Sequence, residues 1–182
     1  MFVDRDAIDL ARTVAGRTFS YALYRYAQVQ SEWLQGSVEA AAVEAEGKRA
    51  TAILTALRDI LALHDDYSLN VSMTKLKAIH PVNPVFEQTL KGNAENGYCR
   101  TYIYELFDTY YLPQLALYTQ WVGARVASGD KTSPWRPARA LPMQEVADAF
   151  YAKPLVETAP SVLHTREAYR AALITLAVAT EW

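Results

Sequence analysis

Between residues 97 and 126, apolar side chains recur at steps of three and four, with one gap at Gln114. This spacing places them on one side of a helix, and the side is broad and rich in aromatic rings. Its members are Ile103, Leu106, Phe107, Tyr110, Leu117, Tyr118 and Trp121. We therefore predict a central helix on which other helices pack.

Pro113 lies inside this pattern. Proline lacks the backbone N–H and crowds the carbonyl four residues earlier, so the helix cannot continue undisturbed. We expect a kink near residues 108–109 rather than a straight rod.

The same spacing predicts further helices along the chain. We expect them at residues 4–35, 37–63, 72–79, 84–91, 142–151 and 166–180. Asp4, Ser37, Ser72 and Thr165 are the expected N-caps, and Gly36 is the expected stop of the first helix. Residues 91–97 are predicted to form a polar loop. Glycine is scarce and strand-like alternation is hard to find, so the predicted class is all-α, a bundle of about five to seven helices.

Length and composition favour one domain. The chain has 182 residues, of which 51% are hydrophobic, enough for a core without disulfides. We expect residues 1–128 to form the bundle core. Residues 129–182 would add a proline-rich loop, held by Trp135, and C-terminal helices packed on the same domain.

Charge and hydropathy argue against two classes of partner. The net charge is -2 and no run of Lys or Arg occurs, so we expect no nucleic acid partner. Nothing approaches the roughly 20 apolar residues that cross a bilayer, so we expect no membrane partner. The N-terminus lacks the signal-peptide pattern, so any signal would lie outside this chain.

Residue types that bind metals or act as nucleophiles are sparse. His64, His80 and His164 have no Glu or His at the helical offsets of zinc or di-iron sites, so no metal and no cofactor are expected. Cys99 near the start of the central helix could have a lowered thiol pKa, but a buried structural cysteine is favoured.

Two further groups could act on a sugar. Glu105 and Asp108 lie three residues apart, and paired carboxylates perform glycoside hydrolysis. On an exposed helix face, however, such a pair is usually only solvated, so we expect no catalytic residue here. Four residues surround the predicted polar loop and could hydrogen-bond sugar hydroxyls, although turns also favour Asn for backbone reasons: Asn83, Asn93, Asn96 and Tyr98.

Several short segments occur in an order that resembles a known family. Asp9-Leu10-Ala11-Arg12 matches D-L-x-R, and residues 53–61 match L-x-x-L-D-x-L-L. Asn83 precedes Gln88-Thr89-Leu90-Lys91-Gly92, which stands where the family has L-T-L-W-G. Gly97-Tyr98-Cys99-Arg100 and Tyr110-Tyr111-Leu112-Pro113-Gln114-Leu115 stand where it has D-Y-A-N and Y-Y-x-P-R-W. Over residues 5–127 the chain resembles the C-terminal all-helical domain of the α-N-acetylglucosaminidases of glycoside hydrolase family 89.

The resemblance implies an upstream (β/α)8 domain that carries two catalytic glutamates. That domain would hydrolyse terminal α-linked N-acetylglucosamine with retention, in a secreted or lysosomal-type setting. A barrel of about 250 residues has no room here. This chain would instead wall the cleft, with Tyr110 and Tyr111 joining Asn83, Asn93 and Tyr98 as candidate substrate-binding residues for a carbohydrate.

The match has departures, which leave open another substrate. Lys91 replaces the family's Trp, Gly97 and Arg100 replace its Asp and Asn, and Gln114-Leu115 replaces its Arg-Trp. The alternative reading is a free-standing helical module for protein interaction or dimerisation, and a third is an enzyme complete in itself. An accessory domain should expose an apolar patch where its partner domain packs.

Overall fold

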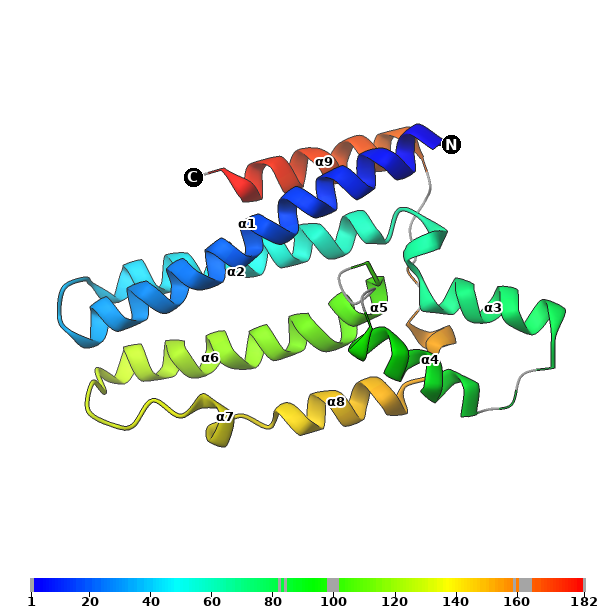
Figure 1. The fold of residues 1–182 in the computed structure, drawn as a ribbon. Coiled ribbons are helices and arrows are strands. Elements are labelled where there is room, and N and C mark those ends of the chain that lie inside the picture. Colours follow the sequence, from blue (N-terminus) through cyan, green and yellow to red (C-terminus); the bar gives the residue numbers. More distant parts are fainter. Residues whose placement is uncertain are drawn as a thin grey trace.

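The computed structural model describes residues 2–81, 83, 85–97, 102–158, 160 and 165–181, with side chains from residue 5 onward. Within these residues every regular element is a helix, which confirms the all-α prediction. Figure 1 shows the long helices lying roughly alongside one another, with shorter helices at one end.

The first two helices form an antiparallel pair. Helix α1 spans Phe2–Leu34 and α2 spans Ala40–Leu61. The turn contains Gly36 at φ 79, a backbone conformation that glycine adopts without strain, as expected for the stop of α1. The expected cap Ser37 is wrong, because Glu39 is the N-cap of α2 and its side chain makes no capping hydrogen bond.

The interface between α1 and α2 supplies much of the core. Small residues at its centre, among them Ala15, Ala22 and Ala50, are wholly buried and let the two helices approach closely. Larger buried side chains fill the space at both ends of this interface: Ile8, Tyr26, Val29 and Trp33 from α1, and Val43, Ile53, Leu54, Leu57, Ile60 and Leu61 from α2.

The predicted central helix begins at Tyr104 and runs as three consecutive pieces. These are α5 (Tyr104–Leu106), the π-helical turn η3 (Phe107–Tyr111) and α6 (Leu112–Ser128). The π turn lies where a kink was expected, and the backbone N–H of Leu112 donates to Phe107 O, five residues back. The wider turn is the local response to Pro113, which has no N–H to offer.

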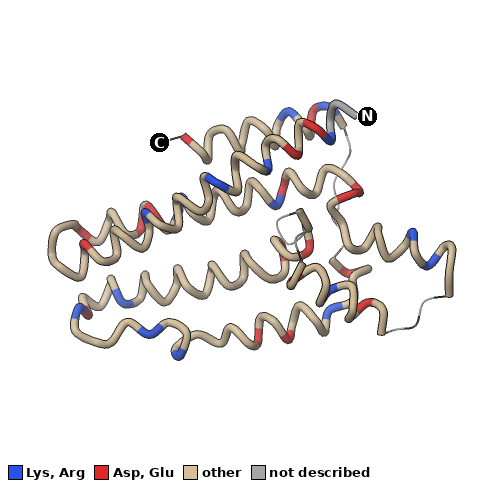
Figure 2. Tube along the Cα trace, viewed as in Figure 1, with Lys and Arg blue, Asp and Glu red and all other residues tan. Residues whose placement is uncertain are grey.

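The rod formed by α5, η3 and α6 packs against α2 on one side and α8 (Met143–Ala152) on the other, which agrees with its predicted central place (Figure 1). Helix α6 carries one charged residue, Arg125, whereas acidic and basic residues are interspersed along α1 and α2 (Figure 2). A nearly uncharged surface suits a helix with neighbours on two sides.

Two helices pack at the end of the bundle where α1 begins. Helix α3 spans Leu69–Ile79, after the short turn η1 (Asp65–Tyr67), and α4 spans Val85–Asn96. Helix α3 starts earlier than expected because Ser68, not Ser72, accepts the hydrogen bond from Val71 N. The predicted polar loop at residues 91–97 is also wrong, because α4 continues to Asn96 and buries Lys91 and Ala94.

The C-terminal part returns along the bundle. The short helix α7 (Pro137–Ala140) precedes α8, and the turn η4 (Leu155–Glu157) follows it. Helix α9 spans Arg166–Thr180 as predicted, with the Thr165 side chain accepting from Ala168 N. Helix α9 packs against α2 and beside α1 (Figure 1).

The segment between α6 and α7 is held by one buried arginine, Arg125. Its guanidinium donates to the carbonyl oxygens of Asp130 at 2.9 Å, Pro134 at 3.3 Å and Ser133. The Trp135 ring lies 4.8 Å from that of Trp121, so this tryptophan holds the loop as expected. Among the described residues, no helix is both long enough and apolar enough to span a membrane.

Candidate functional site

The five residues predicted to bind substrate are not gathered at one place. Asn83 is exposed and accepts a hydrogen bond from Val85 N at 3.0 Å, so it caps the start of α4. Asn93 is exposed on α4, and Tyr98 lies outside the described residues. Tyr110 donates to Glu95 Oε1 at 2.7 Å, whereas Tyr111 lines a groove described below.

The carboxylates of Glu105 and Asp108 do not form a pair, and the expectation that both face solvent is wrong. Glu105 is wholly buried and accepts from Ser68 Oγ at 2.6 Å, Leu69 N at 2.9 Å and Asn70 N at 3.0 Å. These donors are at the start of α3, where the free N–H groups and the helix dipole favour a negative charge. Asp108 instead pairs with Arg58 at 3.2 Å.

A buried lysine has the complementary role at a helix end. Lys91 Nζ donates to the carbonyl oxygens of Tyr151 at 3.1 Å and Lys153 at 2.5 Å, at the end of α8. Its counter-ion Glu87 lies 3.4 Å away and accepts from Leu155 N at 2.8 Å. A cation at this end satisfies carbonyl groups that have no partner within the helix.

Glu95 joins α4 to the aromatic residues of η3 and α8. Both Tyr110 and Tyr151 donate their hydroxyl groups to its carboxylate. The hydrogen bond to Glu95, together with burial, raises the pKa of Tyr151 to about 12. Burial and the same carboxylate raise the pKa of Tyr110. These phenols therefore remain protonated donors at neutral pH, and their protons stay in the hydrogen bonds that join the helices.

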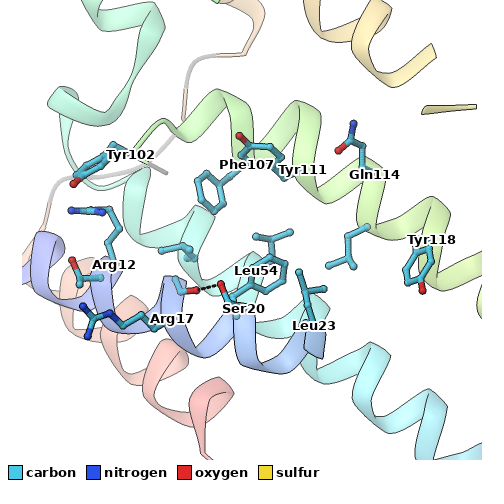
Figure 3. Close-up of a pocket in the computed structure, with 15 residues that line it drawn as sticks. Arg12, Arg17, Ser20, Leu23, Leu54, Tyr102, Phe107, Tyr111, Gln114 and Tyr118 are labelled. Carbon is cyan, nitrogen blue, oxygen red and sulfur yellow. Dashed lines mark hydrogen bonds between the residues drawn. The ribbon is translucent and has the colours of Figure 1, made fainter. Parts of the chain in front are cut away.

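A groove of about 770 Å³ opens between α1 and the η3–α6 segment, above α2 (Figure 3). We call it the α1–α6 groove. Most of its lining surface is apolar, although five polar or charged residues and three tyrosines contribute to it. A mostly apolar lining with some polar groups is typical of ligand sites. The lining residues are Arg12, Thr13, Gly16, Arg17, Phe19, Ser20, Leu23, Leu54, Leu57, Tyr102, Phe107, Tyr111, Gln114, Leu115 and Tyr118.

The groove has a cationic end and an apolar end. Arg12 lies beside Tyr102 at one end, and Leu23 and Tyr118 lie at the other (Figure 3). Arg17 follows just over one helical turn after Arg12 on α1, with its guanidinium away from Tyr102 (Figure 3). The Arg12 guanidinium is 3.3 Å from the centre of the Tyr102 ring and 3.3 Å from Asp9. Arg17 is exposed and forms no ion pair with a described residue.

A second hollow, of about 750 Å³, lies between α2 and α6. We call it the α2–α6 hollow. Alanine and glycine supply much of its lining, including Ala52, Ala116 and Gly123, and polar groups such as Lys48 and Gln120 lie among them. The hollow exists because alanine and glycine have small side chains. Charged residues of one sign do not cluster at either end of it.

The described residues contain no group of three or more His, Cys, Asp or Glu side chains that could hold a metal ion. His64 accepts from Asp66 N at 3.2 Å, and His80 is exposed. Cys99 and His164 lie outside the described residues.

No family model, no curated protein and no solved structure matches this chain.

Sequence reasoning missed the α1–α6 groove, because its walls come from segments that are far apart in the chain. Two signals could have indicated it. Gly16 lies inside a long predicted helix where no turn requires glycine, and a Cβ there would meet nothing within 4 Å. Gln114 is the gap in the apolar pattern of the central helix, and it lies on the groove.

Proposed function

We propose that this chain is a helical accessory domain that packs beside the catalytic domain of a glycoside hydrolase acting on terminal α-linked N-acetylglucosamine. It shapes the substrate cleft and performs no chemistry itself. The sugar connection rests on the ordered segments between Asp9 and Leu115 quoted above. The upstream (β/α)8 domain and its substrate are parts of the same proposal.

The observation that supports a structural role is that three buried charged side chains bind backbone groups of other segments. Glu105 holds the start of α3, Lys91 holds the end of α8, and Arg125 holds the loop after α6. Each of these groups is hydrogen-bonded to partners within this chain, which is typical of a structural role. Lys91 stands at a family Trp position, and its bonds to α8 give that departure a structural purpose.

Exposed apolar residues supply a surface for a neighbouring domain. On α1, Leu10, Val14 and Tyr21 are 68%, 53% and 51% exposed, and their spacing puts them on one side of the helix. On α9, which lies beside α1, Ile174 and Val178 are 54% and 62% exposed. Such residues mark a protein contact surface when they cluster.

The test compares this chain with the longer polypeptide that its upstream reading frame encodes. We expect the longer protein to hydrolyse an aryl α-N-acetylglucosaminide and this chain alone to show no turnover. An upstream frame that encodes no barrel domain, or turnover by this chain alone, would contradict the proposal.

The same exposed residues also favour the alternative, a free-standing interaction or dimerisation module. Sedimentation equilibrium separates the two readings. A stable homodimer that Val14→Asp converts to monomers would support the alternative, and a monomer at micromolar concentration would count against dimerisation.

A further inference from the structure

We propose that the α1–α6 groove binds a single-chain amphiphilic carboxylate, such as a medium-chain fatty acid, with its carboxylate at Arg12 and Arg17. This inference is independent of the accessory role proposed above. It concerns a second property of the chain, the binding of a small amphiphile.

The groove has the size and lining of a small-molecule site. Its volume of about 770 Å³ falls within the range of roughly 300 to 1,000 Å³ usual for ligand pockets. Leu54, Leu57, Phe107 and Leu115 supply apolar surface along its length. An alkyl chain bound in the groove would transfer its apolar surface from water to contacts with these side chains. This transfer is favourable by about 25 cal/mol per Å² of buried apolar surface.

The charge of the lining selects the sign of the head group. The lining includes two arginines and no acidic residue. Asp9 offsets the charge of Arg12, but no described residue pairs with Arg17. An arginine can form two parallel hydrogen bonds with a carboxylate, so an anionic head at this end gains directed contacts that a cationic head lacks.

Other polar groups of the α1 wall are occupied within the helix. Thr13 Oγ1 donates to Asp9 O at 2.8 Å, and Ser20 Oγ donates to Gly16 O at 3.0 Å. Their donor hydrogens are thus used, and the wall between the arginines and Leu23 presents mainly carbon to the groove. A polar ligand would find few free donors on this wall, whereas an alkyl chain needs none.

Gly16 offers a direct way to block the site. A Cβ at Gly16 would meet nothing within 4 Å, so a larger side chain can enter the groove without displacing the core. Gly123 is a matched control, because it too lies inside a helix with open space around it, but in the α2–α6 hollow. Both substitutions replace glycine by a better helix former.

The experiment measures binding of decanoate, below its micelle concentration, by isothermal titration calorimetry. We expect one decanoate per chain, with decyltrimethylammonium bound at least about tenfold more weakly, because one charge-assisted contact is worth roughly that factor. Gly16→Leu should abolish decanoate binding and Gly123→Leu should leave it unchanged. Arg17→Gln should weaken it several-fold, and Arg170→Gln on α9 should not.

The proposal fails if decanoate does not bind, if both amphiphiles bind equally, or if Gly16→Leu binds as well as the unchanged chain. Circular dichroism of each variant separates blocked binding from loss of fold. Binding that follows the expected pattern in folded variants supports the assignment. Since no catalytic assay enters this test, its outcome does not depend on the glycoside hydrolase proposal.

Discussion

At the scale of single residues, buried charged side chains of this protein hydrogen-bond to the ends of other helices. Glu105 binds three donors at the start of α3, from a position on α5 in a different part of the chain. Since a helix start carries partial positive charge, the carboxylate and the helix stabilise each other. The geometry accounts for a wholly buried glutamate that has no lysine or arginine among its hydrogen-bond partners.

Glu105→Gln should lower the free energy of unfolding by about 3 kcal/mol. Leu69 N donates to one carboxylate oxygen of Glu105 and Asn70 N donates to the other, so in either orientation the amide nitrogen of glutamine would face a backbone N–H. Urea unfolding followed by circular dichroism measures the loss. Glu44→Gln, on an exposed part of α2, is the control and should leave stability nearly unchanged. Equal effects at both positions would refute the structural role of Glu105.

Lys91→Met should also destabilise the fold, by about 3 kcal/mol. The variant keeps the apolar stem but leaves two carbonyl oxygens at the end of α8 and the Glu87 carboxylate without their cation. Thermal unfolding of the variant gives the size of the effect, with exposed Lys48→Met as its counterpart. If both lysine variants unfold at the temperature of the unchanged chain, Lys91 does not hold α8.

At the scale of elements, the sequence predicted which segments form helices, but it did not predict several of the helix ends. The bounds of α9 follow from Thr165 and apolar spacing alone, because its cap is local. The start of α3 depends partly on Glu105, which is 36 residues away from Leu69, so no local pattern could place it. Similarly, α4 extends through a glycine-containing polar segment because Lys91 and Ala94 are buried against other elements.

Glycines inside helices are predicted to respond in opposite ways to alanine. Gly16→Ala should stabilise the protein by about 0.5–1 kcal/mol, because it removes backbone entropy from the unfolded chain and meets no atom within 4 Å. Gly47→Ala should destabilise it by about 1 kcal/mol, because a Cβ there would lie 3.0 Å from the Tyr26 ring, whose buried side chain has little room to move.

Chemical denaturation of both alanine variants in parallel tests this difference. Gly123→Ala serves as a second open position and should behave like Gly16→Ala. Stabilisation by Gly47→Ala would show that α1 and α2 can separate at Tyr26 without cost.

At the scale of the whole molecule, the spacing of apolar residues could not predict how all the helices are arranged in space. The stripes of α1, α2 and α6 predicted a shared core, and the structure contains it. Which helices would leave a groove between them was not predictable, because Arg12, Tyr102 and Gln114 come together only through the packing of α1 and α6 on α2. The candidate sugar-binding residues were chosen because they surround a predicted loop or match the family resemblance, and neither criterion contains information on packing. In the structure Asn83 caps the start of α4 and Tyr110 donates to Glu95.

Buried tyrosines couple the stability of the whole fold to alkaline pH. Burial and the nearby Asp9 raise the pKa of Tyr67 to about 12, and the hydrogen bond to Glu95 raises the pKa of Tyr151 to about 12. Burial also raises the pKa of Tyr26. A tyrosine in the unfolded chain loses its proton near pH 10. The folded state therefore holds these protons more tightly, and the contribution of these tyrosines to stability is complete below pH 10 and is lost as pH rises toward 12.

Thermal unfolding between pH 9 and pH 11.5 should show a falling midpoint, and Tyr151→Phe should make that fall shallower because one coupled proton is removed. The phenylalanine variant also loses a hydrogen bond to Glu95, so its midpoint at pH 7 should be lower than that of the unchanged chain. The two curves should then converge as pH rises. Tyr24→Phe, at an exposed position of α1, should follow the unchanged chain throughout. Parallel curves for Tyr151→Phe and the unchanged chain would mean that the Tyr151 proton is not linked to folding.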